Sequence, residues 1–205
     1  MVLVWKLQTL LRDCRTVLDL GCGCNSPARF LRHCQLAGLD GFRPDLDTAR
    51  ARGTHDEYFF GDVREAMTLF PDRKFDACIA LDVVEHLAKE DGWRMIKAME
   101  QLASKRVVIF TPNGFVPQFG GDGNLQQHLS GWEVAEMRQA GYQVMGMHGP
   151  KRLRGEKAAL KFRPRLFWSL VSVLGHYLYS HRRPEKAYSI FCVKQLADQP
   201  TSVES

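Results

Sequence analysis

Four acidic residues lie at or near the ends of successive apolar runs in the first half of the chain. They are Asp19, Asp40, Asp62 and Asp82. When buried strands run parallel, their carboxyl ends meet along one edge of the sheet, where open α/β folds bind ligands. Acids spaced in this way predict a shared crevice whose carboxylates accept hydrogen bonds from hydroxyl, amino or ammonium groups.

The first of these acids leads into a glycine turn. Asp19 is followed by Gly21, Cys22 and Gly23, and a helix start is predicted at Ser26. Because glycine has no side chain, a ligand can lie directly against the backbone N–H groups of such a turn. A dinucleotide-binding turn requires a third glycine where Ser26 stands. Its absence makes a nicotinamide-dependent oxidoreductase the less favoured alternative.

The next two acids suit the two halves of a nucleoside. Asp40 stands 19 residues after Gly21, near the spacing at which an acid accepts hydrogen bonds from ribose hydroxyls, and Gly41 follows it. Asp62 can accept from an adenine amino group, while Val63 offers a backbone N–H and an apolar contact. The alternative for both acids is a local role, as the cap of a helix or turn.

Short, nearly continuous apolar runs alternate with helical patterns along the chain. Strands are predicted at Thr16–Leu20, Gln35–Asp40, Glu57–Phe60, Phe75–Leu81, Arg106–Thr111, Tyr142–Met147 and Tyr188–Lys194, and helices at Ser26–His33, Asp45–Arg52, Arg64–Leu69, Asp91–Leu102 and Gly131–Ala140, with Asp91 as an N-cap. Runs of this kind are typical of strands buried on both faces. The pattern predicts an α/β fold: a doubly wound, mostly parallel seven-stranded sheet with helices on both faces.

With 205 residues, 45% of them hydrophobic, the chain is long enough for one domain with a full core. We expect a single domain over residues 1–196 and a flexible tail over 197–205. An insertion over about 150–186 joins the last two predicted strands. Connections of that length are usually functional.

The order of these motifs resembles class I S-adenosylmethionine-dependent methyltransferases. The resemblance covers about residues 16–149 and is strongest in the glycine turn and in the segment from Phe75 to Leu87. The turn that begins at Thr111 resembles that of small-molecule methyltransferases in the broad type-11 group. Asn25 departs from the pattern, since many members have glycine there.

The resemblance implies S-adenosyl-L-methionine as the cofactor and a role for each acid. In the family, the turn from Gly21 to Gly23 packs against the methionine part. Asp40 would bind the ribose, Asp62 and Val63 the adenine, and Asp82 with Val83 would face the sulfonium and the acceptor. Asp19 and Gly41 complete the expected cofactor-binding set. The function implied is methyl transfer to a small-molecule or lipid- or sugar-linked acceptor, with oxygen as the favoured atom. The alternative is a binding or regulatory protein that retains the fold without catalysis.

Two histidines are candidates for a general base, because imidazole titrates near neutral pH. His128 lies in a segment that, in several O-methyltransferases of the group, borders the acceptor. His86 follows the fourth predicted strand, where the alternative is a structural role in ordering the loop or lining the cofactor site. We expect no metal, since the cysteines near the glycine turn lack the paired spacing of a zinc site.

The positive charge of the chain is concentrated in one segment. The net charge is +5, and ten of the 28 Lys and Arg residues lie between Lys151 and Lys186, flanking the apolar stretch Leu166–Tyr179. Three interpretations are a core helix with solvated ends, a peripheral contact with an anionic membrane, and a lid over the active site. Nucleic-acid binding is disfavoured, since no binding module is visible.

The six cysteines are interpreted as reduced thiols, and no signal peptide is recognisable at the first residues. We therefore expect a cytoplasmic location, with membrane association through the basic segment as an addition.

Overall fold

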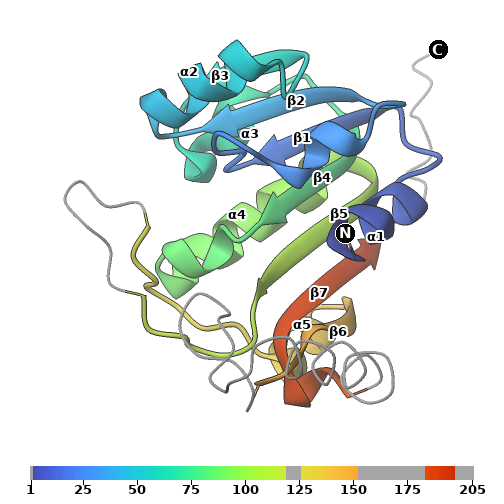
Figure 1. The fold of residues 1–205 in the computed structure, drawn as a ribbon, viewed down its shortest axis with the longest axis vertical. Coiled ribbons are helices and arrows are strands. Elements are labelled where there is room, and N and C mark those ends of the chain that lie inside the picture. The colour runs from blue at the N-terminus through green and yellow to red at the C-terminus, as the bar shows by residue number, and fades with distance from the viewer. Residues whose placement is uncertain (1, 119–125, 152–182, 197–205) are drawn as a thin grey trace, which may run out of the picture. The chain divides into compact units, whose positions relative to one another are not determined.

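The computed structural model describes residues 2–118, 126–151 and 183–196 (Figure 1). Its strands are β1 (Thr16–Leu20), β2 (Gln35–Asp40), β3 (Glu57–Phe60), β4 (Phe75–Leu81), β5 (Ala103–Pro112), β6 (Gln143–Pro150) and β7 (Ala187–Gln195). In the described part of the chain they form one seven-stranded sheet of order β3-β2-β1-β4-β5-β7-β6. Adjacent pairs among β3, β2, β1 and β4 are parallel, and β6 is antiparallel to β7. The predicted fold class is confirmed.

The sheet is accompanied by α-helices and short 3₁₀ turns. They are α1 (Val2–Leu10), η1 (Pro27–Phe30), α2 (Arg43–Arg52), η2 (Val63–Glu65), α3 (Ala66–Leu69), η3 (Val84–His86), α4 (Lys89–Leu102), α5 (Val134–Gln139) and η7 (Pro184–Lys186). The chain divides into two compact units. The first comprises residues 1–81, 93–108 and 195–205, and the second comprises 82–92 and 109–194. The expectation of a single domain stays a prediction.

The core of the first unit forms on parallel strands that are apolar along nearly their whole length. Leu18, Leu20, Leu39 and Ile79 are fully buried. Helix α2 contacts β2 and β3, and α1 contacts η1. Figure 1 shows β3, β2, β1 and β4 side by side in this unit. Burial explains why β1, β2 and β4 begin and end where the apolar runs of the sequence do, whereas the residues of β3 are half-buried or exposed.

The second unit is held by the antiparallel pair β6 and β7, with Met145 opposite Phe191. Phe110, Trp132 and Phe191 are among its largest buried side chains. The side-chain amide of Asn113 donates to the carbonyls of Pro184 (3.0 Å) and Ala187 (2.9 Å). These bonds fix the turn after β5 against the segment that enters β7.

Several predicted helices differ from the observed ones. The helix expected over Ser26–His33 is a single 3₁₀ turn, Pro27–Phe30, which the Ser26 hydroxyl caps by accepting from the N–H of Ala28 at 3.1 Å. Tight turns through Leu31 and Cys34 use the remaining residues before β2 begins. The prediction of an α-helix N-terminus beside the glycine turn is therefore wrong. A helix dipole does not contribute to ligand binding there.

Other boundaries shift by a few residues. Helix α4 begins at Lys89, so Asp91 lies in its first turn and is not the N-cap, and there it still favours the helix electrostatically. Helix α5 is limited to Val134–Gln139, with the Glu136 carboxylate accepting from the backbone N–H of Glu133 at 2.6 Å. Helix α1 has no counterpart among the sequence predictions.

Most of the expected insertion over about 150–186, including Leu166–Tyr179, lies outside the described residues, as does the tail over 197–205. Within the described residues, every helix is too short or too polar to span a membrane.

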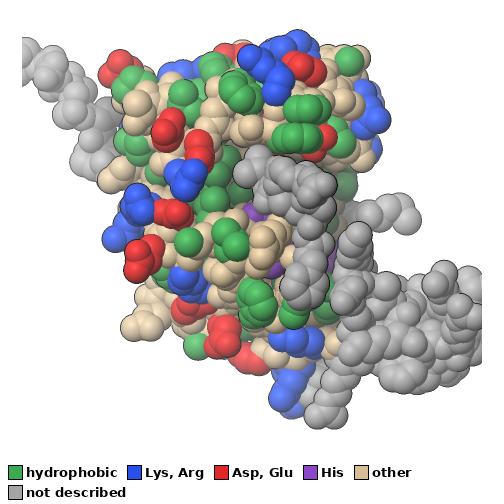
Figure 2. Space-filling model, turned by 90° about the vertical axis from the view of Figure 1, so that its left-hand side faces the viewer, with side chains coloured by type: hydrophobic (Ala, Val, Ile, Leu, Met, Phe, Trp, Pro, Cys, Tyr) green, Lys and Arg blue, Asp and Glu red, His purple; other side chains and the backbone are tan. Residues whose placement is uncertain are grey.

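Charged side chains of both signs lie mainly toward the top, left and bottom of the face drawn in Figure 2. Acidic and basic groups stand next to one another there, with hydrophobic side chains between them. Among the described residues, several charged groups pair, such as Arg73 with Glu57 at 2.9 Å and Arg138 with Glu185 at 2.6 Å. Exposed pairs of this type contribute little stability, and they leave the described surface electrically mixed.

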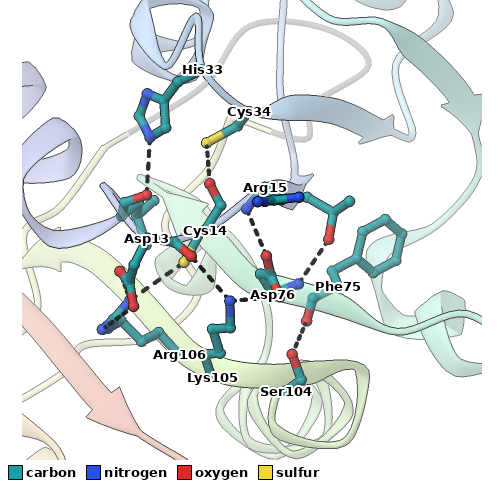
Figure 3. Close-up of polar contacts among 12 residues, drawn as sticks. Asp13, Cys14, Arg15, His33, Cys34, Phe75, Asp76, Ser104, Lys105 and Arg106 are labelled. Atoms are coloured by element: carbon teal, nitrogen blue, oxygen red, sulfur yellow. Dashed lines mark hydrogen bonds and ion pairs between the residues drawn. The ribbon is translucent and has the colours of Figure 1, made fainter.

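A polar network joins β1, β4 and β5 at their amino ends (Figure 3). Asp76 accepts from the backbone N–H of Arg15 at 2.6 Å and pairs with Lys105 at 3.1 Å. Arg106 forms two bonds to Asp13. Since ligands of open α/β sheets bind at the carboxyl ends of strands, this network is structural.

Among the described residues of the first unit, a hydrogen-bonded pair of side chains, Asp19 and His55, is almost completely buried. Asp19 on β1 lies 3.1 Å from Nε2 of His55, and both side chains are almost without solvent exposure. The other ring nitrogen of His55 is 2.9 Å from the hydroxyl of Thr54. Every polar atom of the imidazole therefore has a partner, as burial requires.

We expect His55→Ala to lower the free energy of unfolding by about 3–5 kcal/mol, because it leaves the Asp19 carboxylate buried without a partner. Chemical denaturation followed by circular dichroism measures the loss. The control is His33→Ala at an exposed histidine whose Nε2 is 3.0 Å from the Leu11 carbonyl, and losing this one hydrogen bond should cost only about 0.5–1.5 kcal/mol. Equal effects of the two substitutions would contradict this account.

Candidate functional site

The glycine turn after β1 is anchored to the end of β2. Gly21 and Gly23 adopt left-handed conformations, with φ of 69° and 52°, which favour glycine. The N–H groups of Gly21 and Cys22 both donate to the carbonyl of Leu39, at 2.8 and 3.1 Å. The turn predicted from the sequence is confirmed, and its backbone path is fixed by the neighbouring strand.

Asp40, the last residue of β2, holds this turn from the other side. Its Oδ2 accepts from the N–H of Gly23 at 2.7 Å, and its Oδ1 accepts from the N–H of Phe42 at 2.7 Å, across Gly41. Burial raises the pKa of this carboxyl. Each carboxylate oxygen has two acceptor positions, so one on each remains for a hydroxyl. Asp40 therefore fits the ribose of a nucleoside.

Asp19 is engaged away from the turn, in the buried pair with His55 described above. The neighbouring Cys22 is also buried, and the loss of hydration raises the pKa of its thiol, which keeps it protonated. A Cβ added to Gly38 would lie 2.9 Å from the Cys22 sulfur and 3.1 Å from the His55 ring. Glycine at position 38 thus allows these side chains to pack against β2.

The third predicted acid caps a turn. Asp62 accepts from the backbone N–H of Arg64 at 2.9 Å, and the Arg64 guanidinium also contacts both of its oxygens. This pairing lowers the pKa of the Asp62 carboxyl. Val63 is buried in η2. The local role is therefore present, and the role toward adenine stays a prediction.

Two aromatic rings near these acids were missed by the sequence analysis. Phe42 is 44% exposed and Phe60 is 49% exposed, although both are large and apolar. The Arg43 guanidinium lies 4.4 Å from the centre of the Phe60 ring. Exposed aromatic faces beside an acid suit a flat ligand, but Phe60 lies in an apolar run, which gives no sign that its ring is exposed.

In the second unit, the residues after β4 adopt an unusual path. Asp82 has a φ of 56°, a left-handed conformation rare for residues other than glycine. Its N–H donates to the carbonyl of Phe110 at 2.8 Å. Val83 is buried next to it. The carboxyl groups of Asp82 and Glu85 interact electrostatically. Strain of this kind recurs at functional sites.

Glu85 is a buried carboxylate that the sequence analysis did not select. The hydroxyl of Thr111 donates to its Oε2 at 2.9 Å, and its backbone carbonyl accepts from Leu129 (2.8 Å) and Ser130 (3.1 Å). Burial raises the pKa of the Glu85 carboxyl, and the neighbouring Asp82 carboxyl raises it further. The available signal was the position of Glu85 between Asp82 and His86.

The two histidines selected from the sequence lie together. The rings of His86 and His128 are 4.8 Å apart and nearly perpendicular. Nδ1 of His86 is 3.1 Å from the carbonyl of Gln127, and Nδ1 of His128 is 2.6 Å from the carbonyl of Val116. Burial lowers the pKa of His86, which favours the neutral ring. The ligand atoms of Glu85, His86 and His128 all lie within 4.8 Å of one another.

A buried tryptophan supports this cluster. The indole N–H of Trp132 donates to the Ser130 hydroxyl at 3.0 Å, which in turn donates to the carbonyl of Val84 at 3.2 Å. The Lys89 ammonium lies 3.7 Å from the centre of the indole ring. Gly92 faces the same ring, and a Cβ there would lie 2.4 Å from its Cζ2. The segment after His128 is therefore fixed against η3 and the start of α4.

The comparisons with known proteins agree with this architecture. Residues 18–110 match a family model described as a methyltransferase domain. No match was found among the curated proteins.

Three solved structures show the shared fold. A S-adenosylmethionine (SAM)-dependent methyltransferase from Archaeoglobus fulgidus is 14% identical, with a TM-score of 0.62 over 95% of this chain and 93% of that one. Magnesium protoporphyrin IX methyltransferase from Synechocystis PCC 6803 with bound SAM is 16% identical, with a TM-score of 0.58 over 96% and 79%. TehB from Haemophilus influenzae is 12% identical, with a TM-score of 0.62 over 96% and 62%.

Residues 18–110 form a class I S-adenosylmethionine-dependent methyltransferase domain. The protein is an enzyme, and S-adenosylmethionine is its cofactor. The match begins in β1, just before the glycine turn, and ends within β5. It includes the acids at positions 19, 40, 62 and 82. The preference for this donor over a nicotinamide, inferred from the missing third glycine, is confirmed. Of the residues selected from the sequence of the methyltransferase, the structure joins Gly23 with Asp40, and His86 with His128.

We expect Gly92→Ala to destabilise the methyltransferase by about 1 kcal/mol. Overpacking against the Trp132 ring costs about 1–3 kcal/mol, while alanine gains up to about 1 kcal/mol over glycine within a helix. In a Trp132→Phe background the obstructing part of the ring is absent, and Gly92→Ala should become neutral or stabilising. A double-mutant cycle by denaturant unfolding measures this difference. The same effect in both backgrounds would show that the contact does not constrain the helix.

Proposed function

We propose that this methyltransferase transfers a methyl group from S-adenosylmethionine to a hydroxyl oxygen of a small-molecule or lipid- or sugar-linked acceptor. The observation that carries the proposal is the pair of imidazoles in the second unit. Each has its Nδ1 against a backbone carbonyl, which accepts only, so Nδ1 carries the proton and a neutral ring has its lone pair on Nε2. Two such lone pairs beside a buried carboxylate suit an acceptor that must lose a proton.

Residues of the first unit are proposed to bind the cofactor. The backbone from Gly21 through Cys22 to Gly23 would pack against its methionine part, and Asp40, next to Gly41, would accept from the ribose hydroxyls. Support comes from the fixed path of the turn and from the acceptor positions that remain on Asp40. The other proposed cofactor-binding residues are Asp19, Asp62, Val63, Asp82 and Val83.

The role of Asp19 would be indirect, because its carboxylate is committed to His55. It would stiffen the strand that leads into the glycine turn. To bind adenine, Asp62 would have to share its oxygens between adenine and Arg64, or its bonds to Arg64 would have to break.

The transfer itself is an in-line displacement, in which the enzyme mainly holds the two reactants and excludes water. The acceptor oxygen forms a bond to the methyl carbon as the carbon–sulfur bond breaks, and that electron pair stays on sulfur. The hydroxyl proton must leave as well. His128 is the first candidate to promote its loss and His86 the second, because a neutral imidazole accepts protons near neutral pH.

A small-molecule acceptor is supported by the relatives. The protein from Synechocystis PCC 6803 is named as a magnesium protoporphyrin IX methyltransferase, and its fold is shared over nearly the whole of this chain. The mixed charges on the face drawn in Figure 2 give no support to a nucleic acid as the acceptor. Peripheral membrane contact through residues 151–186 and a cytoplasmic location stay predictions, because the segment is mostly outside the described residues.

The experiment that tests the proposal measures release of S-adenosylhomocysteine with matched acceptor pairs, such as a phenol and the corresponding aniline. We expect turnover with a hydroxylated member and little with its amine partner. Transfer to amines alone would contradict O-methylation.

For a productive acceptor, we expect His128→Ala to lower kcat by about 10²–10⁴-fold, the usual contribution of proton transfer. Calorimetric binding of S-adenosylmethionine should be unchanged, which separates the effect from misfolding. His33→Ala is the control, since this exposed histidine lies elsewhere. Full turnover in His128→Ala would remove the residue from the mechanism.

For the cofactor, we expect Asp40→Asn to weaken S-adenosylmethionine binding by about 10–100-fold, because hydrogen bonds to a charged group are worth about 1.5–3 kcal/mol. Titration calorimetry measures the change. The control is Asp47→Asn, which removes the same charge at an exposed position that pairs only loosely with Arg50, at 3.4 Å. Equal affinities of the two variants for S-adenosylmethionine would contradict the assignment of Asp40 to cofactor binding.

A further inference from the structure

We propose that Glu85, His86 and His128 bind one divalent transition-metal ion. The ligand atoms of these side chains lie within 4.8 Å of one another, so a single ion can reach all three after small side-chain adjustments. The absence of a metal was expected from the sequence because the cysteines lack zinc-site spacing. Cysteine spacing bears only on a thiolate site, and the sequence alone does not show that His128 lies next to Glu85 and His86.

The hydrogen bonds of the two imidazoles are those of metal ligands. A ligating histidine nearly always donates its second ring N–H to a carbonyl or carboxylate, which orients the ring and fixes its tautomer. His86 meets this condition through the carbonyl of Gln127 at 3.1 Å, and His128 meets it through the carbonyl of Val116 at 2.6 Å. The Nε2 atoms of both rings thereby keep the lone pairs that a cation requires.

The carboxylate supplies the negative charge. One oxygen of Glu85 accepts from Thr111 at 2.9 Å, and the carboxyl of Asp82 interacts electrostatically with that of Glu85. Neither Thr111 nor Asp82 carries positive charge, and the Glu85 side chain is buried, so a cation bound to it would supply the missing opposite charge. Lys89, the basic residue near this segment, directs its ammonium to Glu136 at 2.6 Å. A metal ion would therefore neutralise the negative charge of Glu85, which Thr111, Asp82 and Lys89 do not neutralise.

The three ligands are held in place by the backbone. The carbonyl of Glu85 accepts from the N–H groups of Leu129 and Ser130, which directly follow His128. His86 is the next residue after Glu85, in the same 3₁₀ turn. Contacts of this kind fix the ligands before the ion arrives, which reduces the ordering cost of binding.

The donor set selects the metal. Two imidazoles and one carboxylate are typical of sites for Fe²⁺, Zn²⁺ or Mn²⁺, whereas Mg²⁺ and Ca²⁺ prefer oxygen ligands alone. Three protein ligands also leave open coordination positions, as catalytic metal sites do. The ion would lower the pKa of an acceptor hydroxyl and so replace direct deprotonation by an imidazole. That role, unlike the site itself, rests on the proposed O-methylation.

The test is titration of the full-length chain, freed of metal by a chelator, with Mn²⁺ alone. We expect one saturable site per chain. Glu85→Gln, His86→Ala and His128→Ala should each weaken binding by more than about 100-fold, since loss of even an outer partner of a ligand costs about 10–100-fold. His33→Ala, at an exposed histidine outside the cluster, should bind Mn²⁺ like the unmodified chain. Absence of a saturable site, or binding that survives all three substitutions, would overturn the inference.

A second measurement avoids the risk that a variant fails to fold. Pulsed electron paramagnetic resonance of Mn²⁺ bound to the unmodified chain should show couplings to two imidazole nitrogens. A spectrum with oxygen ligands only would overturn the site. Turnover is measured separately with the acceptor pairs: if Mn²⁺ binds through imidazoles but hydroxyl acceptors are not methylated, the site stands and O-methylation fails.

Discussion

The buried carboxylate of Glu85 is the constraint on which the second unit depends. A buried polar group must find hydrogen-bond partners, or the fold loses stability. The side chain of Glu85 binds Thr111 near the end of β5, and its carbonyl binds the backbone that follows His128. One residue thus positions a strand end, a 3₁₀ turn and a loop that are distant in sequence. His86 and His128 meet because these bonds bring their segments together.

The first unit uses carboxylates in the same manner. Asp40 accepts from the N–H groups of Gly23 and Phe42 and so fixes the turn that is proposed to hold the cofactor. Asp19 forms a buried pair with His55 near the same turn. In both units the acids first organise the backbone, and ligands then meet groups whose positions are already set. Such preorganisation is what a methyl transfer that relies on alignment requires.

The sequence predicted the strands better than the helices. β1, β2 and β4 have the expected bounds because their apolar runs are largely buried, and such runs are visible in the sequence. β3 also has the expected bounds, although its residues are half-buried or exposed. The stretch after Ser26 was misassigned because a capping residue followed by proline can begin either an α-helix or a single 3₁₀ turn. The family resemblance indicated His128 as a candidate residue, but it did not predict the contact between His128 and His86. The bonds from Glu85 to residues 111, 129 and 130 are tertiary, and nothing in the local pattern indicates them.

The most direct measurement is X-ray diffraction at the manganese absorption edge, from crystals of the methyltransferase grown with Mn²⁺ and S-adenosylhomocysteine. The account predicts an anomalous peak bonded to Glu85, His86 and His128, at ligand distances of about 2.0–2.2 Å. A map without a peak at that position, or with the ion held by other residues while these three keep only their protein hydrogen bonds, would contradict it.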